Sequence, residues 1–229
     1  MMKLILQTVF FVFPMFVRRL LYGWIWGYQI SPNAKIGFSW ILADELIMEE
    51  HTFIQSLTIV KNIDRLVMRK YSRIGPLNFI TGFNTKISGI AFKKGRFSHV
   101  KGRKCELILE EDVAINSRHF IDCNGGVYFG KHSSLAGIRS QILTHGIDPY
   151  NSRQDAQPVI IGNYCSIGSG SIILKGTIIP DYAIVGAGAV LNKRYTESYK
   201  IYAGVPACGK KDLNYNEVKW FSRQSGDVI

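Results

Sequence analysis

The sequence predicts an all-β protein whose chain winds into a three-sided stack of short coils. Aliphatic residues return at every sixth position from Ile161 to Leu191 without a miss. A small residue stands four positions after each of the first five of them. Neither an α-helix nor a plain strand has a six-residue period, whereas a coil made of short strands and corners does.

This ladder is the clearest element of the sequence. It comprises the aliphatic residues Ile161, Ile167, Ile173, Ile179, Val185 and Leu191, with the small residues Cys165, Ser171, Thr177, Ala183 and Ala189. We expect each hexapeptide to form one strand and one corner, three of them to complete a coil, and the aliphatic side chains to point inside. Because one coil cannot bury its own apolar face, the repeat should extend upstream.

The six-residue step does recur upstream, with interruptions. The first run is Met48, Ile54, Val60 and Leu66, and it continues two residues out of phase as Met68, Ile74 and Ile80. The second run is Leu109, Ile115, Ile121 and Val127, and it continues after another slip of two residues as Phe129 and Leu135. We interpret such slips as loops inserted at corners. Two longer breaks, the Lys-, Arg- and Gly-rich residues 83–105 and the polar residues 144–158, are the expected carriers of function, because loops on a regular scaffold usually are.

Residues 4–30 form an apolar segment that does not follow the repeat. The uncharged run before Arg18 is about 14 residues, shorter than the roughly 20 that cross a bilayer, and Pro14 interrupts it. A secretory signal also fits badly, since only Lys3 precedes the run and no small-residue cleavage site is obvious. Two interpretations remain: a segment in the membrane interface with Arg18 and Arg19 on anionic lipid, or an apolar arm packed against a neighbouring subunit.

The length and charge of the chain bound its organisation and its partners. At 229 residues it is long enough for one folded body, for which we expect an apolar helical segment at 1–35, a β-helix at 36–206 and a tail at 207–229. The formal charge of +11 favours an anionic partner or surface. No basic helix or zinc-finger spacing indicates nucleic acid, so we predict no such partner. The four cysteines are far apart, which favours reduced thiols in a cytoplasmic protein. The apolar N-terminus and the positive charge favour a location at the inner face of the cytoplasmic membrane.

Three stretches of the sequence are similar to a known family. Residues 162–170, residues 184–190 and the ending Ala203-Gly204-Val205-Pro206-Ala207 resemble hexapeptide acyltransferases, above all galactoside and maltose O-acetyltransferases and those that modify bacterial exopolysaccharides. The resemblance implies a left-handed parallel β-helix, a homotrimer and acetyl-CoA as the acyl donor. It further implies transfer of the acetyl group to a hydroxyl of a sugar or polysaccharide precursor.

His145 is the candidate catalytic residue. It lies in Leu143-Thr144-His145-Gly146-Ile147-Asp148-Pro149, which looks like the His-x-x-Asp-Pro segment that carries the family's catalytic histidine. A hydroxyl is a poor nucleophile until its proton is removed, and a neutral imidazole is suited to remove it near neutral pH. The imidazole also needs an acceptor on its other nitrogen. Asp148 is near in sequence, but it serves equally well to shape the turn before Pro149.

The other candidate site residues come from the resemblance. Asn116 and Asp122 roughly match the family's acceptor-binding positions, and we group them with Asp148 as substrate-binding candidates. Corners with little side chain would accommodate coenzyme A between adjacent prisms. The candidate cofactor-binding residues are Gly168, Ser169, Gly186, Ala187, Asn192, Lys193 and Lys211, the two lysines as phosphate contacts. Cys208 stands where relatives often have an arginine, and Lys210 and Lys211 are candidates to replace it.

Three other functions remain open. A zinc hydrolyase on this fold needs three histidines around the metal, and His145 has no histidine a few residues on, so we expect no metal. A non-catalytic scaffold would use the β-helix to display the basic loop 83–105 and the apolar N-terminus at a membrane. An N-acetyltransferase acting on an amino sugar would need the same base as an O-acetyltransferase.

Overall fold

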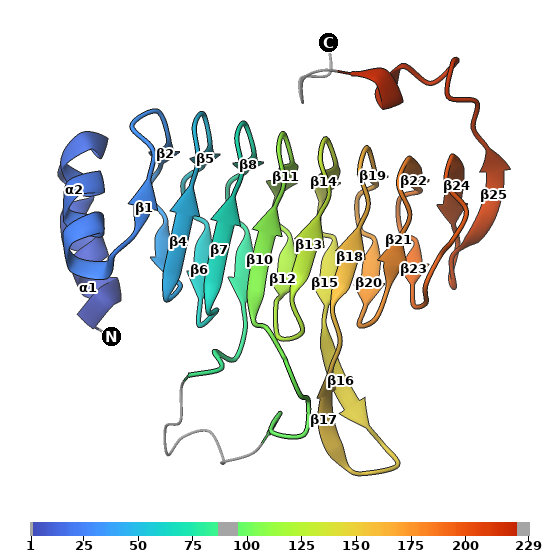
Figure 1. The fold of residues 1–229 in the computed structure, drawn as a ribbon, viewed down its shortest axis with the longest axis horizontal. Helices are drawn as coiled ribbons and strands as arrows, with labels where there is room; N and C mark the ends of the chain where they lie inside the picture. Colours follow the sequence, from blue (N-terminus) through green and yellow to red (C-terminus); the bar gives the residue numbers. More distant parts are fainter. Residues whose placement is uncertain (1, 87–95, 224–229) are drawn as a thin grey trace.

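The computed structural model describes residues 2–86 and 96–223. Two helices, α1 (Met2–Phe10) and α2 (Met15–Trp26), cover the N-terminal end of a long stack of strands (Figure 1). Almost all strand pairs are parallel and join one coil to the next. Each coil contributes a strand to each of three sheets, so the chain forms a three-sided parallel β-helix.

The three sheets are the sides of the prism, which we call A, B and C in the order in which the chain passes through them. Side A consists of β1 (Gln29–Ile30), β4 (Glu45–Met48), β7 (Arg65–Met68), β10 (Glu106–Leu109), β13 (Val127–Phe129), β18 (Val159–Ile161) and β21 (Ile178–Ile179). Side B consists of β2 (Lys35–Ile36), β5 (Phe53–Ile54), β8 (Arg73–Ile74), β11 (Ala114–Ser117), β14 (Ser134–Ile138), β19 (Ser166–Ile167), β22 (Ala183–Val185), β24 (Lys200–Ala203) and β25 (Cys208–Asp212). Side C consists of β3 (Trp40–Leu42), β6 (Ile59–Lys61), β9 (Phe79–Thr81), β12 (Phe120–Asp122), β15 (Gln141–Leu143), β20 (Ile172–Leu174) and β23 (Val190–Leu191).

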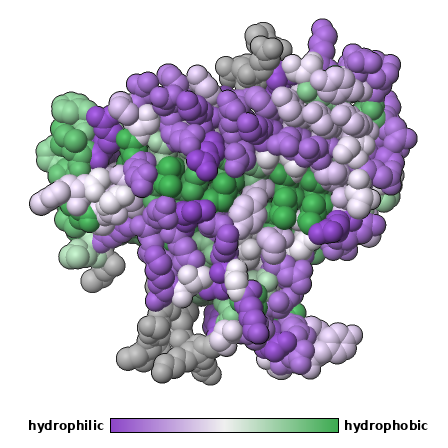
Figure 2. All heavy atoms as spheres, in the orientation of Figure 1, coloured by the Kyte–Doolittle hydropathy of each residue, from purple (hydrophilic) through white to green (hydrophobic). Residues whose placement is uncertain are grey.

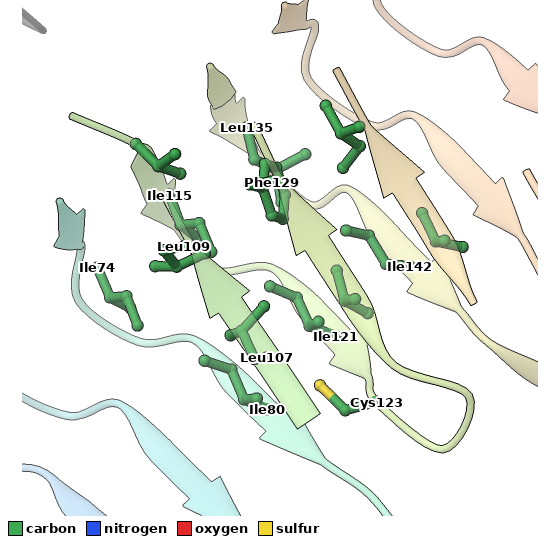
Figure 3. Close-up of a cluster of buried hydrophobic side chains, with 14 of the residues drawn as sticks. Ile74, Ile80, Leu107, Leu109, Ile115, Ile121, Cys123, Phe129, Leu135 and Ile142 are labelled. Carbon is green, nitrogen blue, oxygen red and sulfur yellow. The ribbon is translucent and has the colours of Figure 1, made fainter. Parts of the chain in front are cut away.

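The core of the prism is the predicted aliphatic ladder. All six residues from Ile161 to Leu191 are at most 2% exposed, and the upstream members Ile74, Ile115, Ile121 and Leu135 line the same interior (Figure 3). Stacking brings equivalent residues of successive coils into contact, as when Ile121 pairs with Ile80 and Ile142. The burial of these side chains is the main stabilising contribution, since apolar area removed from water stabilises by about 25 cal/mol per Å².

The two-residue slips in the repeat do not mark loops, which corrects our interpretation of them. Leu66 and Met68 both lie in β7 and both are fully buried, and Val127 and Phe129 are buried together in β13. Successive side chains of a strand point to opposite faces. The slip is therefore the spacing of two inward positions on one longer strand of side A.

Residues 144–158 also differ from the irregular loop that we expected. They form an antiparallel hairpin of β16 (His145–Asp148) and β17 (Arg153–Ala156) that projects from the prism (Figure 1). Asp148 closes the hairpin turn, because its carboxylate accepts hydrogen bonds from the backbone N–H of Tyr150 and from the Asn151 side chain. The Asn151 bond also lowers the pKa of Asp148 below its ordinary value.

A ladder of aromatic side chains runs along the corner between sides A and B, a feature that the hexapeptide pattern does not reveal. His132, Tyr164, Tyr182 and Tyr199 have φ between 54° and 60°, and their rings stack with centroids 4.7 to 5.3 Å apart. Left-handed backbone costs a residue with a side chain of order 1 kcal/mol or more, and stacking offsets part of it. The C-terminal tail packs on this ladder through Phe221 in η1 (Lys219–Ser222).

The N-terminal helices are fixed to the first coil by buried polar contacts. The Gln7 amide both donates to the carbonyl and accepts from the N–H of Ile41, and the Arg18 guanidinium donates to the carbonyls of Ile36 and Gly37. The strand β1 that follows the helices already pairs with β4, so the sheet begins within the segment expected at 1–35. Among the described residues, no helix is both long enough and apolar enough to span a bilayer.

Candidate active site

Two insertions leave the prism at the same corner, where the chain passes from side C to side A. Residues 82–105 separate β9 from β10, and the β16–β17 hairpin separates β15 from β18. The short turn between β12 and β13 lies between them along the prism axis. Both insertions project from the same edge of the prism (Figure 1). Their common corner brings side chains that are far apart in the sequence to one place.

Close backbone approaches at this corner require glycine. A Cβ atom on Gly82 would lie 2.2 Å from the sulfur of Cys105, where the first insertion returns to the prism. A Cβ atom on Gly125 would lie 2.4 Å from the carbonyl oxygen of Gln157, where the hairpin returns. Real Cβ atoms do not come so close to other atoms, so both positions hold the insertions against the stack through the lack of a side chain.

His145 is the first residue of the hairpin, and its imidazole is paired with a buried carboxylate. Its Nδ1 lies 2.5 Å from Oδ2 of Asp122, whose side chain is 1% exposed. The His145 side chain is 33% exposed. A carboxylate only accepts hydrogen bonds, so the Nδ1 proton is directed at Asp122 and Nε2 carries the free lone pair. Within the part of the chain that the structure describes, no hydrogen bond to Nε2 is formed.

Asp122 is surrounded by donors. Its Oδ2 also accepts from the backbone N–H groups of Thr144 and His145, and its Oδ1 accepts from the backbone and side-chain N–H groups of Asn124. A carboxylate that accepts several hydrogen bonds is held in one orientation, and it fixes the imidazole in turn. Our sequence analysis made Asp122 a substrate-binding candidate, but the structure places it beneath His145, with almost no surface for a sugar.

The first insertion folds over His145 and forms an aromatic wall. The rings of Phe83 and Phe97 meet the imidazole edge-on, at centroid distances of 6.3 and 6.1 Å. Asn124 joins this wall to the Asp122–His145 pair, because its Oδ1 accepts the backbone N–H of Phe83. The imidazole is therefore in contact with two aromatic rings while a third of its side chain remains exposed.

The hairpin that carries His145 is tied to the following coil by an ion pair. The Lys175 ammonium lies 2.7 Å from the carboxylate of Asp155 in β17, with both side chains about a quarter exposed. Lys175 follows β20 at the same corner as His145, one coil further along the axis. This pair restrains the hairpin against the next coil.

The remaining substrate-binding candidates lie away from the imidazole. Asn116 is in β11 on side B, where it lines a small pocket with Gln55 and Arg73. Asp148 is at the turn end of β16 and is used by that turn. Residues six apart occupy successive sides of the coil rather than equivalent edges, so Asn116 and Asp122 face different surfaces.

The cofactor-binding candidates fall into three groups. Gly168, Ser169, Gly186 and Ala187 lie at the corner between sides B and C. Asn192 and Lys193 follow β23 at the His145 corner and are exposed, and Lys211 is in β25 on side B. Within one chain, the first group and His145 are at opposite edges of side C.

The glycines of the first group have a structural role as well. A Cβ atom on Gly168 would lie 2.6 Å from the backbone of Ala187 in the next coil. The neighbouring Gly170 and Gly188, which we did not single out from the sequence, have φ of 69° and open space where a Cβ would be. These two glycines leave the backbone at this corner uncovered.

A second histidine and aspartate pair provides an internal comparison. His132 Nδ1 lies 2.9 Å from Oδ2 of Asp112 at the corner between sides A and B. Its ring stacks on Tyr164, and its carbonyl accepts a hydrogen bond from Arg223. His132 and His145 thus lie at different corners. Among the described residues, no group of three or more His, Cys, Asp or Glu side chains is arranged to hold a metal ion.

Comparison with known proteins agrees with this architecture. Residues 158–193 match the family model described as bacterial transferase hexapeptide (six repeats). A search of curated proteins gave no match. The chain is similar in structure to a polysialic acid O-acetyltransferase, with 20% identity, coverage of 81% of this chain and 84% of that chain, and a TM-score of 0.55.

Two further solved structures resemble the chain less closely. One is a hexapeptide-repeat acetyltransferase from Vibrio cholerae O1 biovar eltor in complex with acetyl coenzyme A, with 18% identity and a TM-score of 0.49. The match covers 64% of this chain and 70% of that chain. The other is a maltose O-acetyltransferase from Clostridium difficile 630, with 14% identity and a TM-score of 0.43; the match covers 91% of this chain and 83% of that chain. The predicted left-handed β-helix with hexapeptide repeats is confirmed.

Proposed function

We propose that the protein is an acyltransferase that moves an acetyl group from acetyl-CoA to a hydroxyl of a sugar or polysaccharide precursor. The observation that carries this proposal is the His145–Asp122 pair, with its 2.5 Å contact, at the base of a hairpin on a hexapeptide-repeat β-helix. The pair leaves one imidazole nitrogen free at a half-open corner. That arrangement is suited to a general base.

The reaction uses the two nitrogens of the imidazole for different tasks. His145 Nε2 accepts the proton of the acceptor hydroxyl while the hydroxyl oxygen attacks the acyl carbon. The new C–O bond forms, the C–S bond breaks, and the imidazolium returns the proton to the departing thiolate. Asp122 stabilises the imidazolium through Nδ1 and keeps the proton off Nε2 beforehand. The thioester is already activated, so no covalent intermediate on the protein is needed.

The donor site is proposed to lie between two copies of the chain in a homotrimer. The uncovered corner at Gly170 and Gly188 and the His145 corner stand at opposite edges of side C. A neighbouring prism would supply the second wall that each needs, so that Ser169 and Ala187 of one chain approach His145 of the next. Lys193, exposed at the His145 corner, is then the candidate phosphate contact.

Acceptor-dependent release of thiol from acetyl-CoA tests this function. The purified chain should release thiol faster in the presence of a sugar than in its absence, and the product should carry an ester that mild base removes. An amide that resists mild base would instead support transfer to an amino sugar. Absence of acetyl transfer to any sugar, amino sugar or sugar phosphate would favour the non-catalytic scaffold.

The apolar N-terminal cap is proposed to rest on a membrane surface. Its outer face exposes ten large apolar side chains, among them Leu20 at 64% and Trp24 at 85% exposure (Figure 2). Residues 1–43 contain no Asp or Glu. Lys3 and Arg18 are turned inward onto backbone carbonyls, so the outer face presents apolar surface that suits the acyl boundary of a bilayer.

A vesicle experiment tests the membrane contact. Replacing Leu20 and Trp24 by serine should weaken cosedimentation with phosphatidylglycerol vesicles by at least about tenfold, because each buried side chain contributes about 1.5 to 3 kcal/mol. Tyr150→Ser is the matched control, since this aromatic residue is 96% exposed on the hairpin. If the double variant binds vesicles normally but loses self-association, the cap is a subunit contact and the proposal is wrong.

A further inference from the structure

Two arginines lie beside the candidate base, each separated from it by one aromatic ring. The Arg96 guanidinium is 4.9 Å from the ring centroid of Phe83, and the Arg103 guanidinium is 4.7 Å from that of Phe97. Both rings are in edge contact with the His145 imidazole. Each guanidinium therefore contacts a ring that in turn contacts the imidazole, so the first insertion places two positive charges around the candidate base.

The charge of this insertion is of one sign. No Asp or Glu occurs between Asp64 and Glu106, whereas residues 83–105 contain seven Lys and Arg. A cluster of like charges on a folded chain is unfavourable unless an anion is nearby. The charge is therefore more than a solvated surface needs, and Arg96 and Arg103 are the members of it that contact the rings beside His145.

The two arginines, like Lys101, have no carboxylate partner among the described residues, whereas two other cations of the insertion do. Lys86 lies 3.8 Å from Asp44, and Lys104 lies 4.0 Å from Glu106. Within residues 2–86 and 96–223, neither Arg96 nor Arg103 forms an ion pair. Arg103 donates one hydrogen bond to the carbonyl of Asn124, which orients it toward the Asp122–His145 pair. Arg96 is exposed.

We propose that Phe83, Arg96 and Arg103 form an acceptor subsite for an acidic sugar, one that carries a phosphate or a carboxylate. This inference rests on the proposed function and names its substrate class. The sugar ring lies against the half-buried Phe83 with one hydroxyl at His145 Nε2, and the anionic group is bound by the guanidinium groups. Arginine binds phosphate and carboxylate in a planar, two-pronged geometry. Phe97, only 8% exposed, supports Arg103 from beneath.

The position of the insertion along the prism separates this subsite from the donor. The insertion leaves the stack before β10, on the N-terminal side of the turn that holds Asp122 and Asn124. The candidate phosphate contact Lys193 follows β23, on the C-terminal side of His145. Acceptor and donor anions would thus approach the imidazole from opposite directions, which is required if the hydroxyl and the thioester are to meet there.

Kinetics with matched acceptors test the subsite. Acetyl transfer from acetyl-CoA is measured for a neutral hexose, the same hexose as its 1-phosphate, and the corresponding uronic acid. The wild-type KM should be lowest for one of the acidic sugars, and which one it is distinguishes phosphate from carboxylate. Arg96→Gln should raise that KM by about tenfold to a hundredfold, the value of one charge-assisted contact, with KM for acetyl-CoA unchanged.

Lys131→Gln is the matched control, because it removes a cation that is paired with Glu111 at another corner. It should leave the KM values for all three acceptors unchanged. A wild-type preference for the neutral hexose would overturn the acidic subsite while leaving the proposed function intact. A rise in KM for acetyl-CoA alone in Arg96→Gln would assign the cations to the donor. Failure to acetylate any acceptor would overturn the function and the subsite together.

Discussion

Replacing His145 by asparagine should reduce acceptor-dependent thiol release by roughly 10²- to 10⁴-fold, the usual contribution of a positioned general base. The variant keeps a polar side chain that can still donate to Asp122, so the buried carboxylate is not left without a partner. The loss should fall on kcat, because the imidazole acts on a proton in the transition state and contributes little to binding. Continuous detection of the released thiol at saturating acetyl-CoA measures kcat.

His132→Asn is the matched control for this prediction. His132 forms a similar contact with Asp112, but at a corner that neither insertion approaches. The variant should retain the wild-type rate but lose some stability, because the His132 ring stacks on Tyr164. Equal rates for wild type and His145→Asn would remove His145 from the chemistry, whatever the fold.

Replacing Asp122 by asparagine should lower kcat by a similar roughly 10²- to 10⁴-fold. Every group around this side chain is a donor: the N–H groups of Thr144, His145 and Asn124 and the Nδ1 proton of the imidazole. An asparagine side chain has one accepting oxygen and one donating NH₂ group, so its NH₂ group must face some of these donors. Turned toward Nδ1, it donates to that nitrogen and moves the ring proton to Nε2, where the base needs a lone pair.

The Asp122→Asn experiment must separate chemistry from folding. Unpaired donors should also lower the free energy of unfolding by about 1 to 3 kcal/mol, so the rates are compared well below the unfolding midpoints of both proteins. Asp112→Asn disturbs the His132 pair in the same way and should leave kcat unchanged. If Asp122→Asn keeps its kcat while folded, the carboxylate has only a structural role.

The fold could be predicted because the prism places an inward side chain at regular steps. From Ile161 to Leu191 one large buried aliphatic residue recurs at every sixth position, so the period is directly visible; Val159, the second inward residue of β18, lies before this run. Where a strand of side A turns two residues inward, as with Leu66 and Met68, the period shifts although the fold does not. We therefore read a property of strand length as an inserted loop.

The pairing of His145 with Asp122 was only half predictable. Asp122 pairs with Leu143 of the next coil, and Leu143 is two residues before His145. This register was hidden because Leu135 and Ile142 are seven residues apart, and β14 contains an irregularity that takes up the extra residue. Once the ladder is aligned through this bulge, the pairing of Asp122 with the start of the hairpin follows from the stack.

The aromatic wall could not be predicted in the same way. Phe83, Phe97 and Asn124 belong to an insertion and a turn, whose paths are set by tertiary contacts rather than by a period. Asn124 holds the insertion through the backbone N–H of Phe83, which no pattern in residues 83–105 indicates. The basic composition of the insertion was visible in the sequence, but its position over His145 required the structure.

A crystal structure with coenzyme A bound tests the central claim most directly. We predict the thiol sulfur within about 5 Å of His145 Nε2, because the acyl carbon bonded to it must come within about 3.5 Å of the attacking oxygen, with space beside the Phe83 ring for an acceptor. A sulfur bound at a different corner of the prism, or an Nε2 enclosed by protein atoms on every side, would contradict the account.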